Sequence, residues 1–355
     1  MMIENNTSLK AFNTFSIDVK AQILFHFNNL KQIPELLALV KTTRVQNKPL
    51  LILGGGSNIL FCEDFSGLVI KVDLSGVEII ESADSFLLEV AAGENWHKLV
   101  ADCIDKGING LENLALIPGV VGAAPVQNIG AYGTEFKDFC ESVEYLDLKS
   151  GALQRLSAKE CLFAYRDSIF KTTKMQDALI TKVTIKLTKE WQAHNHYGRL
   201  QNAVTTDQPV SAKQIFASVC QIRSEKLPDP DKLGNAGSFF KNPLVTAQHS
   251  QQLLVLYPHM PHYPQADGQV KLAAGWLIEQ ANLKGTHIGG AAVHQQQALV
   301  LINQNNASAA DVIQLANLVR STVKDKFNIK LEHEVRFICA TGESNLTEAV
   351  NKCRN

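Results

Sequence analysis

The chain has 355 residues, with 45% apolar and 19% charged side chains and a formal net charge of −1. A chain of this length usually forms two or three domains, and this composition is ordinary for a soluble globular protein. The near-zero charge, without a basic face, argues against nucleic acid or an anionic membrane as a partner.

The sequence shows neither a targeting signal nor residues spaced as metal ligands. The N-terminal segment lacks the apolar core of a signal peptide, and no run of about 18 apolar residues follows it. The seven cysteines are scattered without a C-x-x-C pair, which favours reduced thiols. No set of His, Asp or Cys residues has metal-ligand spacing. We therefore expect a cytoplasmic protein without a metal ion.

The N-terminal part of the chain is expected to alternate strands with glycine-rich loops. An apolar strand run enters the glycine cluster at 54–56, and strand runs follow at 67–72 and 86–95. Helical spacing at 96–107 ends on a glycine. The segment 110–133 is too rich in Gly and Pro for a regular element, and segments of this kind are uncommon unless they are functional.

The middle of the chain predicts a hairpin, a strand and a capped helix. The hairpin covers 143–157 with its turn at Lys149, and a β-branched strand run follows at 177–190. Ser211 is the expected N-cap of a helix over 211–226, with Gln214 completing a capping box. The run at 227–235, rich in Pro and Asp, predicts a domain boundary.

Helices and strands also mix in the C-terminal part. Helices are expected at 272–285 and 308–327, and a strand at 298–303. The run at 329–338 alternates as a strand, which places Glu332 and Glu334 on one face together with Arg336. Because no strict β-α-β rhythm is present, the pattern favours the α+β class.

Two glycine-rich segments are candidates for a ligand site. In the first, Gly54, Gly55 and Gly56 expose backbone N–H groups beside Ser57 and Asn58, which suits either an anion nest or a plain tight turn. It is not a Rossmann fingerprint, because the third glycine is missing. The second segment, 117–133, adds amide groups that can bind the edge of a flat ring. Together they suit a ligand with a pyrophosphate and a polar ring.

At this point the chain resembles a known family. Ten motifs occur in order across residues 8–340, and they read "NTF", "LGGGSN", "LIPGVVGAAPVQNIGAYG", "YRDSIFK", "KLPDP", "GNAGSFFKNP", "QADGQVKLAAGWLIEQ", "GGAAVH", "ALVLIN" and "LEHEVRF". This set is similar to the UDP-N-acetylenolpyruvoylglucosamine reductase family. The segment "YGRL" is characteristic of the longer, type I form.

The resemblance implies a fold and a domain plan. It implies an α+β chain with a two-lobed FAD-binding module of the vanillyl-alcohol-oxidase (PCMH) type and a C-terminal α/β substrate-binding domain. The implied boundaries are a first FAD lobe at 1–70, a second at 71–227 and a substrate domain at 228–328. A C-terminal strand and tail at 329–355 return to the active site. We expect a monomer.

The resemblance also implies the reaction. NADPH reduces non-covalently bound FAD, and the enolpyruvyl UDP-sugar then takes the same site. Flavin N5 delivers a hydride, and the neighbouring carbon receives a proton, which gives UDP-N-acetylmuramate for peptidoglycan synthesis. The alternative is another FAD oxidoreductase of the same fold with a different substrate. A sugar-nucleotide binder without flavin is disfavoured by the two glycine segments.

Carried over by motif, the implied cofactor-binding residues are Gly54, Gly55, Gly56, Ser57, Asn58, Ile117, Pro118, Gly119, Gly122, Ala123, Gln127, Asn128, Gly130, Ala131 and Arg336. The implied substrate-binding residues are Tyr132, Tyr197, Lys226 and Asn242. The chain departs from the family at Ala123 and Ala124, where a serine is common. A hydroxyl contact with FAD is lost there, so backbone N–H groups are expected to replace it.

The implied catalytic residues are Ser238, Glu334 and Arg166. Arg166 would pair with the substrate carboxylate, where an ion pair with its neighbour Asp167 is the plain alternative. Strand alternation alone cannot choose between Glu332 and Glu334, and the motif position selects Glu334. His333 is expected to be structural.

Ser238 lacks the G-x-S-x-G setting of a hydrolase nucleophile, and it is expected to act as a proton donor. A serine hydroxyl is a weak acid, so a donor role needs cationic help from Lys241 or Arg166, or a water chain that replaces the proton.

Overall fold

The computed structural model describes residues 3–196, 198, 200–201 and 210–353, and these form two compact units. The first unit holds 1–7, 22–56 and 67–225, and the second holds 8–21, 57–66 and 226–355. Each unit is therefore assembled from separated stretches of chain. The four-part division expected from the family resemblance stays a prediction.

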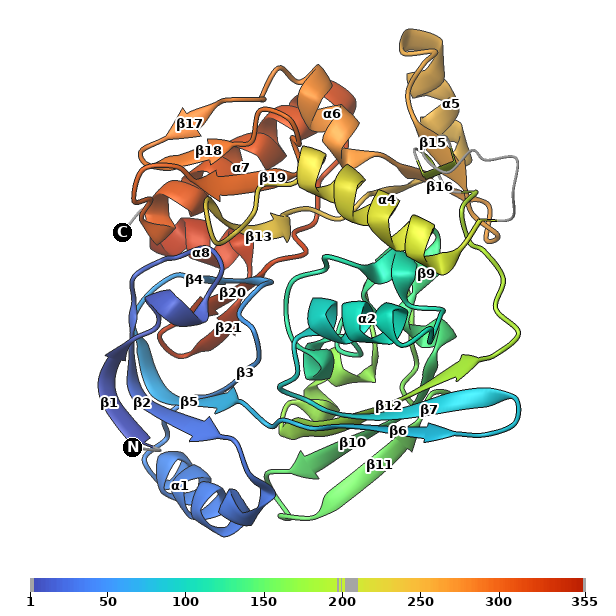
Figure 1. Ribbon diagram of the computed structural model, residues 1–355. Helices are drawn as coiled ribbons and strands as arrows, with labels where there is room; N and C mark the ends of the chain where they lie inside the picture. The colour runs from blue at the N-terminus through green and yellow to red at the C-terminus, as the bar shows by residue number, and fades with distance from the viewer. Residues whose placement is uncertain (1–2, 197, 199, 202–209, 354–355) are drawn as a thin grey trace. The chain divides into compact units, whose positions relative to one another are not determined.

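The first unit contains two larger sheets (Figure 1). One has the strand order β1-β2-β5-β3, in which β3 and β5 pair in parallel, and the other has the antiparallel order β11-β10-β12-β7-β6. The strands of the first unit are β1 (Ile3–Ser8), β2 (Lys20–Phe27), β3 (Leu50–Leu53), β5 (Phe65–Val72), β6 (Val77–Glu81), β7 (Ser85–Ala91), β8 (Gly130–Ala131), β9 (Thr134–Glu135), β10 (Cys140–Asp147), β11 (Leu153–Ser157) and β12 (Ala178–Thr188).

The helices of the first unit complete one hydrophobic core. They are η2 (Leu30–Gln32), α1 (Ile33–Val45), α2 (Trp96–Asp105), η3 (Glu112–Leu114), η4 (Val121–Ala123), η5 (Phe136–Asp138), η6 (Ile169–Lys171), η7 (Thr173–Met175) and α4 (Ala212–Lys226). Buried side chains of both sheets, such as Phe25 and Val183, belong to the same cluster as Trp96 of α2. The core is thus continuous across the whole unit.

The second unit consists of three small sheets and their helices (Figure 1). The sheet orders are β13-β19-β18-β17, β14-β16-β15 and β21-β20-β4. Its elements are η1 (Lys10–Phe12), β4 (Ile59–Phe61), β13 (Gly234–Ser238), β14 (Leu244–Thr246), α5 (Ala247–Leu256), β15 (His262–Pro264), β16 (Gln269–Leu272), α6 (Ala274–Gln280), β17 (His287–Ile288), β18 (Ala291–Val293), β19 (Val300–Asn303), α7 (Ala309–Phe327), β20 (Arg336–Cys339), β21 (Gly342–Ser344) and α8 (Leu346–Lys352).

Local sequence signals explain several of these elements. Ser211 Oγ accepts from Gln214 N, and Gln214 Oε1 accepts from Ser211 N at 2.9 Å, which is the predicted capping box before α4. The predicted hairpin is also confirmed, because β10 pairs with β11 antiparallel. Ser308 caps α7, and its capping box uses Asp311.

The predicted strand at 329–338 is wrong for its first part. Only Arg336–Cys339 is a strand, and it pairs in parallel with β4. Before that, the chain makes a single isolated bridge between His333 and Phe240. The alternation of buried and exposed side chains nevertheless continues, with Leu331 and Val335 buried. The two-residue alternation in this segment therefore reflects which side chains are buried. It does not indicate a continuous ladder of strand hydrogen bonds.

Candidate active site

Ser238 is the last residue of β13, in the second unit. Asn235 pairs with Ile302 and Ser238 with Val300, so β13 has one extra residue between them, and Gly237 has φ +71°. The segment is thus a bulged strand. Bulges redirect side chains, and the Ser238 side chain is exposed. In the part of the chain that the structure describes, its hydroxyl makes no hydrogen bond.

The chain's N-terminal "NTF" motif holds this strand in place. Thr14 O accepts from Asn235 N at 2.9 Å, and the Thr14 hydroxyl donates to Asn235 O at 2.6 Å. The Asn235 side chain accepts from Gly237 N at 2.9 Å, which supports the bulge directly. A motif more than two hundred residues away in sequence thus fixes the backbone that carries Ser238.

Glu334 is brought beside this strand by its backbone. Glu334 N donates to Phe239 O at 2.8 Å, one residue after Ser238, and the Glu334 side chain is half-buried. Glu332 differs, because its side chain is 77% exposed and its Oε2 lies 3.8 Å from Lys241 Nζ. The surroundings therefore favour Glu334 as the carboxylate near Ser238. The same ion pair reduces the positive charge that Lys241 could offer.

His333 has the structural contacts that the sequence suggested. Its Nδ1 lies 2.8 Å from Val335 O, and its ring packs edge-on against Phe337 at 4.8 Å between centroids. Burial is the main cause that lowers the pKa of His333. A neutral imidazole packed in this way fixes the turn that presents Glu334.

Asn58 and Arg336 join the same region of the second unit. Arg336 N donates to Asn58 O at 3.0 Å, and Asn58 Nδ2 donates to Glu334 O at 3.3 Å. The Arg336 guanidinium forms a bidentate pair with Glu343, at 2.9 and 2.6 Å. A contact between Arg336 and FAD would therefore have to share that guanidinium with Glu343.

Two predicted substrate ligands, Lys226 and Asn242, also belong to the second unit. Lys226 ends α4. Asn242 Oδ1 accepts from Ala274 N at 2.9 Å, at the start of α6. That bond orients the Asn242 amide, so its NH₂ group is the end that could donate to a phosphate. Tyr197 lies outside the described residues.

The two predicted flavin segments meet in the first unit. A Cβ on Gly55 would lie 2.9 Å from the Cα of Gly119, and one on Gly54 would lie 2.8 Å from Val120 Cγ2. Side chains at these positions would force the two loops apart. Gly119 itself has φ +118°, which L side chains rarely adopt. The glycines therefore let the backbones of the two loops pack closely together, and we call this pair of loops the glycine cradle.

The backbone N–H groups after Gly119 are less available to a ligand than expected. Val121 N donates to Glu94 O and Gly122 N to Ala92 O, both at 2.8 Å. The amides of Ala123 and Ala124 donate inside η4, each at 3.0 Å. Backbone donors at 123 and 124 are thus engaged within the fold, so they do not replace the missing hydroxyl. A Cβ on Gly122 would also meet Ala92 at 2.6 Å, so this glycine is needed for packing.

Asn128 organises the second segment from within. The residue is fully buried with φ +44°, and its Nδ2 donates to Glu135 Oε2 and Ala164 O, each at 3.0 Å. Its Oδ1 accepts from Lys137 N at 3.0 Å. The side-chain amide of Asn128 is thus engaged within the fold, and its contact with FAD stays a prediction. Gln127 is half-buried.

Tyr132 stands at the tip of a small hairpin. β8 and β9 pair antiparallel, with Ala131 opposite Thr134, and the two turn residues Tyr132 and Gly133 have φ +49° and +82°. Positive φ at both positions is typical of a two-residue hairpin turn. Asn113 Nδ2 donates to Tyr132 O at 3.1 Å and fixes this tip. Burial raises the pKa of the Tyr132 phenol.

Arg166 is tied to the same segment. Its backbone is left-handed, with φ +54°, and its Nη2 donates to Gly130 O at 2.7 Å. Asp167 Oδ1 accepts from Ser168 N at 2.9 Å. The guanidinium is thus directed toward the loop at 128–130, where the resemblance places flavin contacts.

Arg223 on α4 is a candidate that sequence reasoning missed. Its Nη2 donates to Leu116 O at 3.1 Å, whereas its Nε is buried without a hydrogen-bond partner. Burial is the main cause that lowers the pKa of Arg223, and the charge of Arg166 lowers it further. Buried donors without a partner are rare, and they occur at strained or catalytic positions or where a water or an ion binds. The sequence signal was a lone arginine in a helical pattern, which carries no information about burial.

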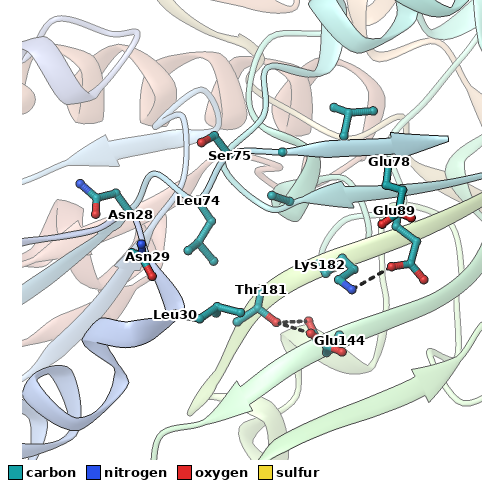
Figure 2. A pocket seen from close by; sticks show the side chains of 13 residues that line it. Asn28, Asn29, Leu30, Leu74, Ser75, Glu78, Glu89, Glu144, Thr181 and Lys182 are labelled. Carbon is teal, nitrogen blue, oxygen red and sulfur yellow. Dashed lines mark hydrogen bonds and ion pairs between the residues drawn. The ribbon is translucent and has the colours of Figure 1, made fainter.

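A pocket elsewhere in the first unit contains none of the predicted residues (Figure 2). Its volume is about 510 Å³, and the labelled lining side chains include Glu78, Glu89 and Glu144. Lys182 is the basic residue of the lining, and its Nζ lies 2.9 Å from Glu89 Oε2. Carboxylates outnumber the basic group among the charged residues of the wall, so it is unsuited to the phosphates of a dinucleotide.

Comparisons with known proteins agree with this geometry. The family model for an FAD binding domain matches residues 28–157, and the model for the C-terminal domain of UDP-N-acetylenolpyruvoylglucosamine reductase matches residues 229–338. The reductase of Escherichia coli K12 is 52% identical over 98% of this chain and 100% of its own length. The chain belongs to the UDP-N-acetylenolpyruvoylglucosamine reductase family.

Other members of the family extend the comparison. The reductase of Salmonella typhimurium LT2 is 52% identical over 97% of this chain and 99% of its own length. The crystal structure of the reductase from Thermus caldophilus has a TM-score of 0.64 at 24% identity, covering 94% of this chain and 98% of that one. This likeness supports the α+β fold with an FAD module of the PCMH type.

Membership of the family confirms the predicted enzyme class. The chain is an FAD-dependent oxidoreductase, and FAD is its cofactor. The family acts in peptidoglycan precursor synthesis. Among the described residues, no helix is long and apolar enough to cross a membrane.

Proposed function

We propose that this chain reduces UDP-N-acetyl-3-O-(1-carboxyvinyl)-glucosamine to UDP-N-acetylmuramate, with NADPH as the reductant. The observation that supports it most is an exposed Ser238 on a bulged strand, next to the backbone of Glu334. It stands in a chain that is 52% identical to reductases of this name. The alternative is an FAD oxidoreductase of the same fold with another substrate.

In this proposal the first unit holds the cofactor. The cradle of Gly54, Gly55 and Gly119 would take the pyrophosphate, because glycine-rich loops can offer backbone N–H groups to an anion. Gly56, Ile117, Pro118 and the hairpin residues Gly130 and Ala131 are further proposed contacts. When bound, FAD supplies the hydride that reduces the double bond of the substrate.

The second unit would supply the proton. Ser238 Oγ is proposed to give its proton to the carbon next to the one that receives the hydride. Glu334 is proposed to pass on the proton that replaces it. The negative charge that spreads onto the substrate carboxylate needs cations, and Arg166 and Arg223 are proposed to provide them. Lys226, Asn242, Tyr132 and Tyr197 are the proposed ligands of the rest of the UDP-sugar.

The spectrum of bound flavin tests this proposal. Purified protein should be yellow, bleach on anaerobic addition of NADPH, and recover its colour on addition of the enolpyruvyl UDP-sugar. UDP-N-acetylglucosamine, which lacks the double bond, is the matched control and should leave the flavin bleached. Recovery with oxygen or another acceptor, but not with the enolpyruvyl UDP-sugar, would favour the alternative enzyme.

A further inference from the structure

Leu116 has an unusual backbone at the entrance of the second flavin segment. Its φ is +55°, in the left-handed region. That region is disfavoured for a residue with a side chain, because Cβ comes too close to the carbonyl oxygen. Leu116 directly precedes Ile117–Gly119, so its dihedral angles set the direction in which the chain enters the cradle.

Two side chains form hydrogen bonds with the backbone of Leu116, and we call this pair of bonds the grip. Leu116 N donates to His97 Nδ1, and Leu116 O accepts from Arg223 Nη2, each at 3.1 Å. His97 is the second residue of α2, and Arg223 lies in the last turn of α4. Both polar groups of a strained backbone residue are thus held from two different helices.

The grip is itself held in place. The His97 ring stacks on Phe216 of α4, with centroids 5.8 Å apart and planes 11° apart. Because Nδ1 accepts a hydrogen bond, the neutral ring carries its proton on Nε2. The α2 helix is capped by Asn95, whose side chain accepts from Lys98 N. The stacking on Phe216 and the hydrogen bond from Leu116 N together orient the His97 ring.

We propose that His97 and Arg223 are positioning residues that keep Leu116 left-handed and so hold Gly119 and Val120 against Gly54 and Gly55. The inference rests on the proposed assignment of these segments to FAD. Loss of the grip lets Leu116 relax toward ordinary dihedral angles, and the cradle opens. The measurable consequence is faster release of FAD.

The test follows FAD release from the holoenzyme by the rise in flavin fluorescence after dilution. His97→Phe keeps a ring against Phe216 but removes the acceptor, and it should release FAD roughly tenfold faster, since a backbone donor loses its partner. His97→Asn places an amide oxygen near the position of Nδ1. It should stay within about threefold of the wild type.

Leu116→Gly provides the decisive comparison. Glycine adopts positive φ without steric cost, so a chain with this change no longer needs the grip. The double variant H97F/L116G should therefore return to within about threefold of L116G alone. Release of FAD from H97F at the wild-type rate would overturn the proposal. The proposal would also fail if H97F/L116G released FAD faster than L116G by the same factor that separates H97F from the wild type. An equal defect in H97N and H97F would overturn it as well.

This test is separate from the proposed reaction. FAD release is measured without NADPH or substrate, and circular dichroism of each variant shows that it is folded. A wild-type chain that retains FAD but does not reduce the enolpyruvyl UDP-sugar would refute the proposed function and leave the positioning role intact. Reduction of the substrate with unchanged release in H97F would do the reverse.

Discussion

The surroundings of single residues separate two carboxylates that strand alternation alone could not. Glu332 and Glu334 alternate on one face of the chain, but Glu332 is exposed and paired with Lys241, whereas Glu334 is half-buried with its backbone bonded to Phe239. An exposed ion pair contributes little and exchanges with solvent. These surroundings favour Glu334 as the proposed proton-relay carboxylate.

Replacing Glu334 by Gln should slow flavin reoxidation by the enolpyruvyl UDP-sugar by about 10²-fold, because a positioned acid or base contributes on this order. Reduction of the flavin by NADPH should change little. Stopped-flow absorbance of each half-reaction measures this difference. Glu332→Gln is the matched control and should be close to the wild type in both. The reverse result for the two variants would transfer the role to Glu332.

The pH dependence of stability should report on His97. Burial, and then the charge of Arg223, lowers the pKa of its imidazole. The folded state thus favours the neutral ring. This contribution is complete above about pH 6.5, the value in the unfolded chain, and is lost as pH falls toward and through the lower folded pKa.

Melting temperatures of the holoenzyme between about pH 8 and pH 5 measure this effect. The wild type should lose more stability on acidification than His97→Asn, which cannot titrate. Burial lowers the pKa of His294 and His333 as well, so both proteins should show some acid loss. Only the difference between them belongs to His97. If the melting temperatures of the two proteins fell in parallel with pH, the lowered pKa of His97 would be contradicted.

At the scale of an element, the bulge in β13 is the feature that directs Ser238. Gly237 has φ +71°, and a Cβ there would meet no atom within 4 Å. Its glycine is therefore required by the backbone conformation alone. Gly268, in the turn between β15 and β16, shares both properties, with φ +81° and no atom within 4 Å. It offers a control in the same unit.

Gly237→Ala and Gly268→Ala should each lower the free energy of unfolding by about 1 kcal/mol, because alanine is strained at positive φ. Only Gly237→Ala should also slow the substrate half-reaction, since it changes the direction of Ser238. Urea unfolding and stopped-flow reoxidation provide the two measurements. Equal slowing in both variants would show that the bulge has no special role.

Elements with strong local signals were predictable from the sequence. The capping box of Ser211 and Gln214, the glycine after α2 and the β10–β11 hairpin depend on neighbours within a few residues. The glycine cradle was predictable as two loops, because runs of glycine indicate close backbone approach. The family resemblance supplied the enzyme class and the cofactor, which no local pattern contains.

Features that depend on distant partners were not predictable. The bulge before Ser238 depends on the pairing of β13 with β19 and on Thr14. Asn128 resembled a ring-binding amide, but Glu135, Lys137 and Ala164 occupy its side chain. The grip on Leu116 joins helices more than one hundred residues apart. One-dimensional patterns contain no signal for such contacts.

At the scale of the whole molecule, the proposed roles are distributed over the two units. The proposed flavin cradle belongs to the first unit, and Ser238 and Glu334 belong to the second. All of these residues come from one chain, and the monomer stays a prediction. A change at Ser238 should therefore affect the proton step and leave cofactor binding and flavin reduction alone.

Ser238→Ala tests this central claim most directly. Anaerobic stopped-flow absorbance should show flavin reduction by NADPH at nearly the wild-type rate, and reoxidation by the enolpyruvyl UDP-sugar slowed by about 10² to 10⁴-fold. Retained FAD would show that the first unit is intact. Reoxidation at the wild-type rate, or equal slowing of both half-reactions, would contradict the assignment of Ser238 as the proton donor.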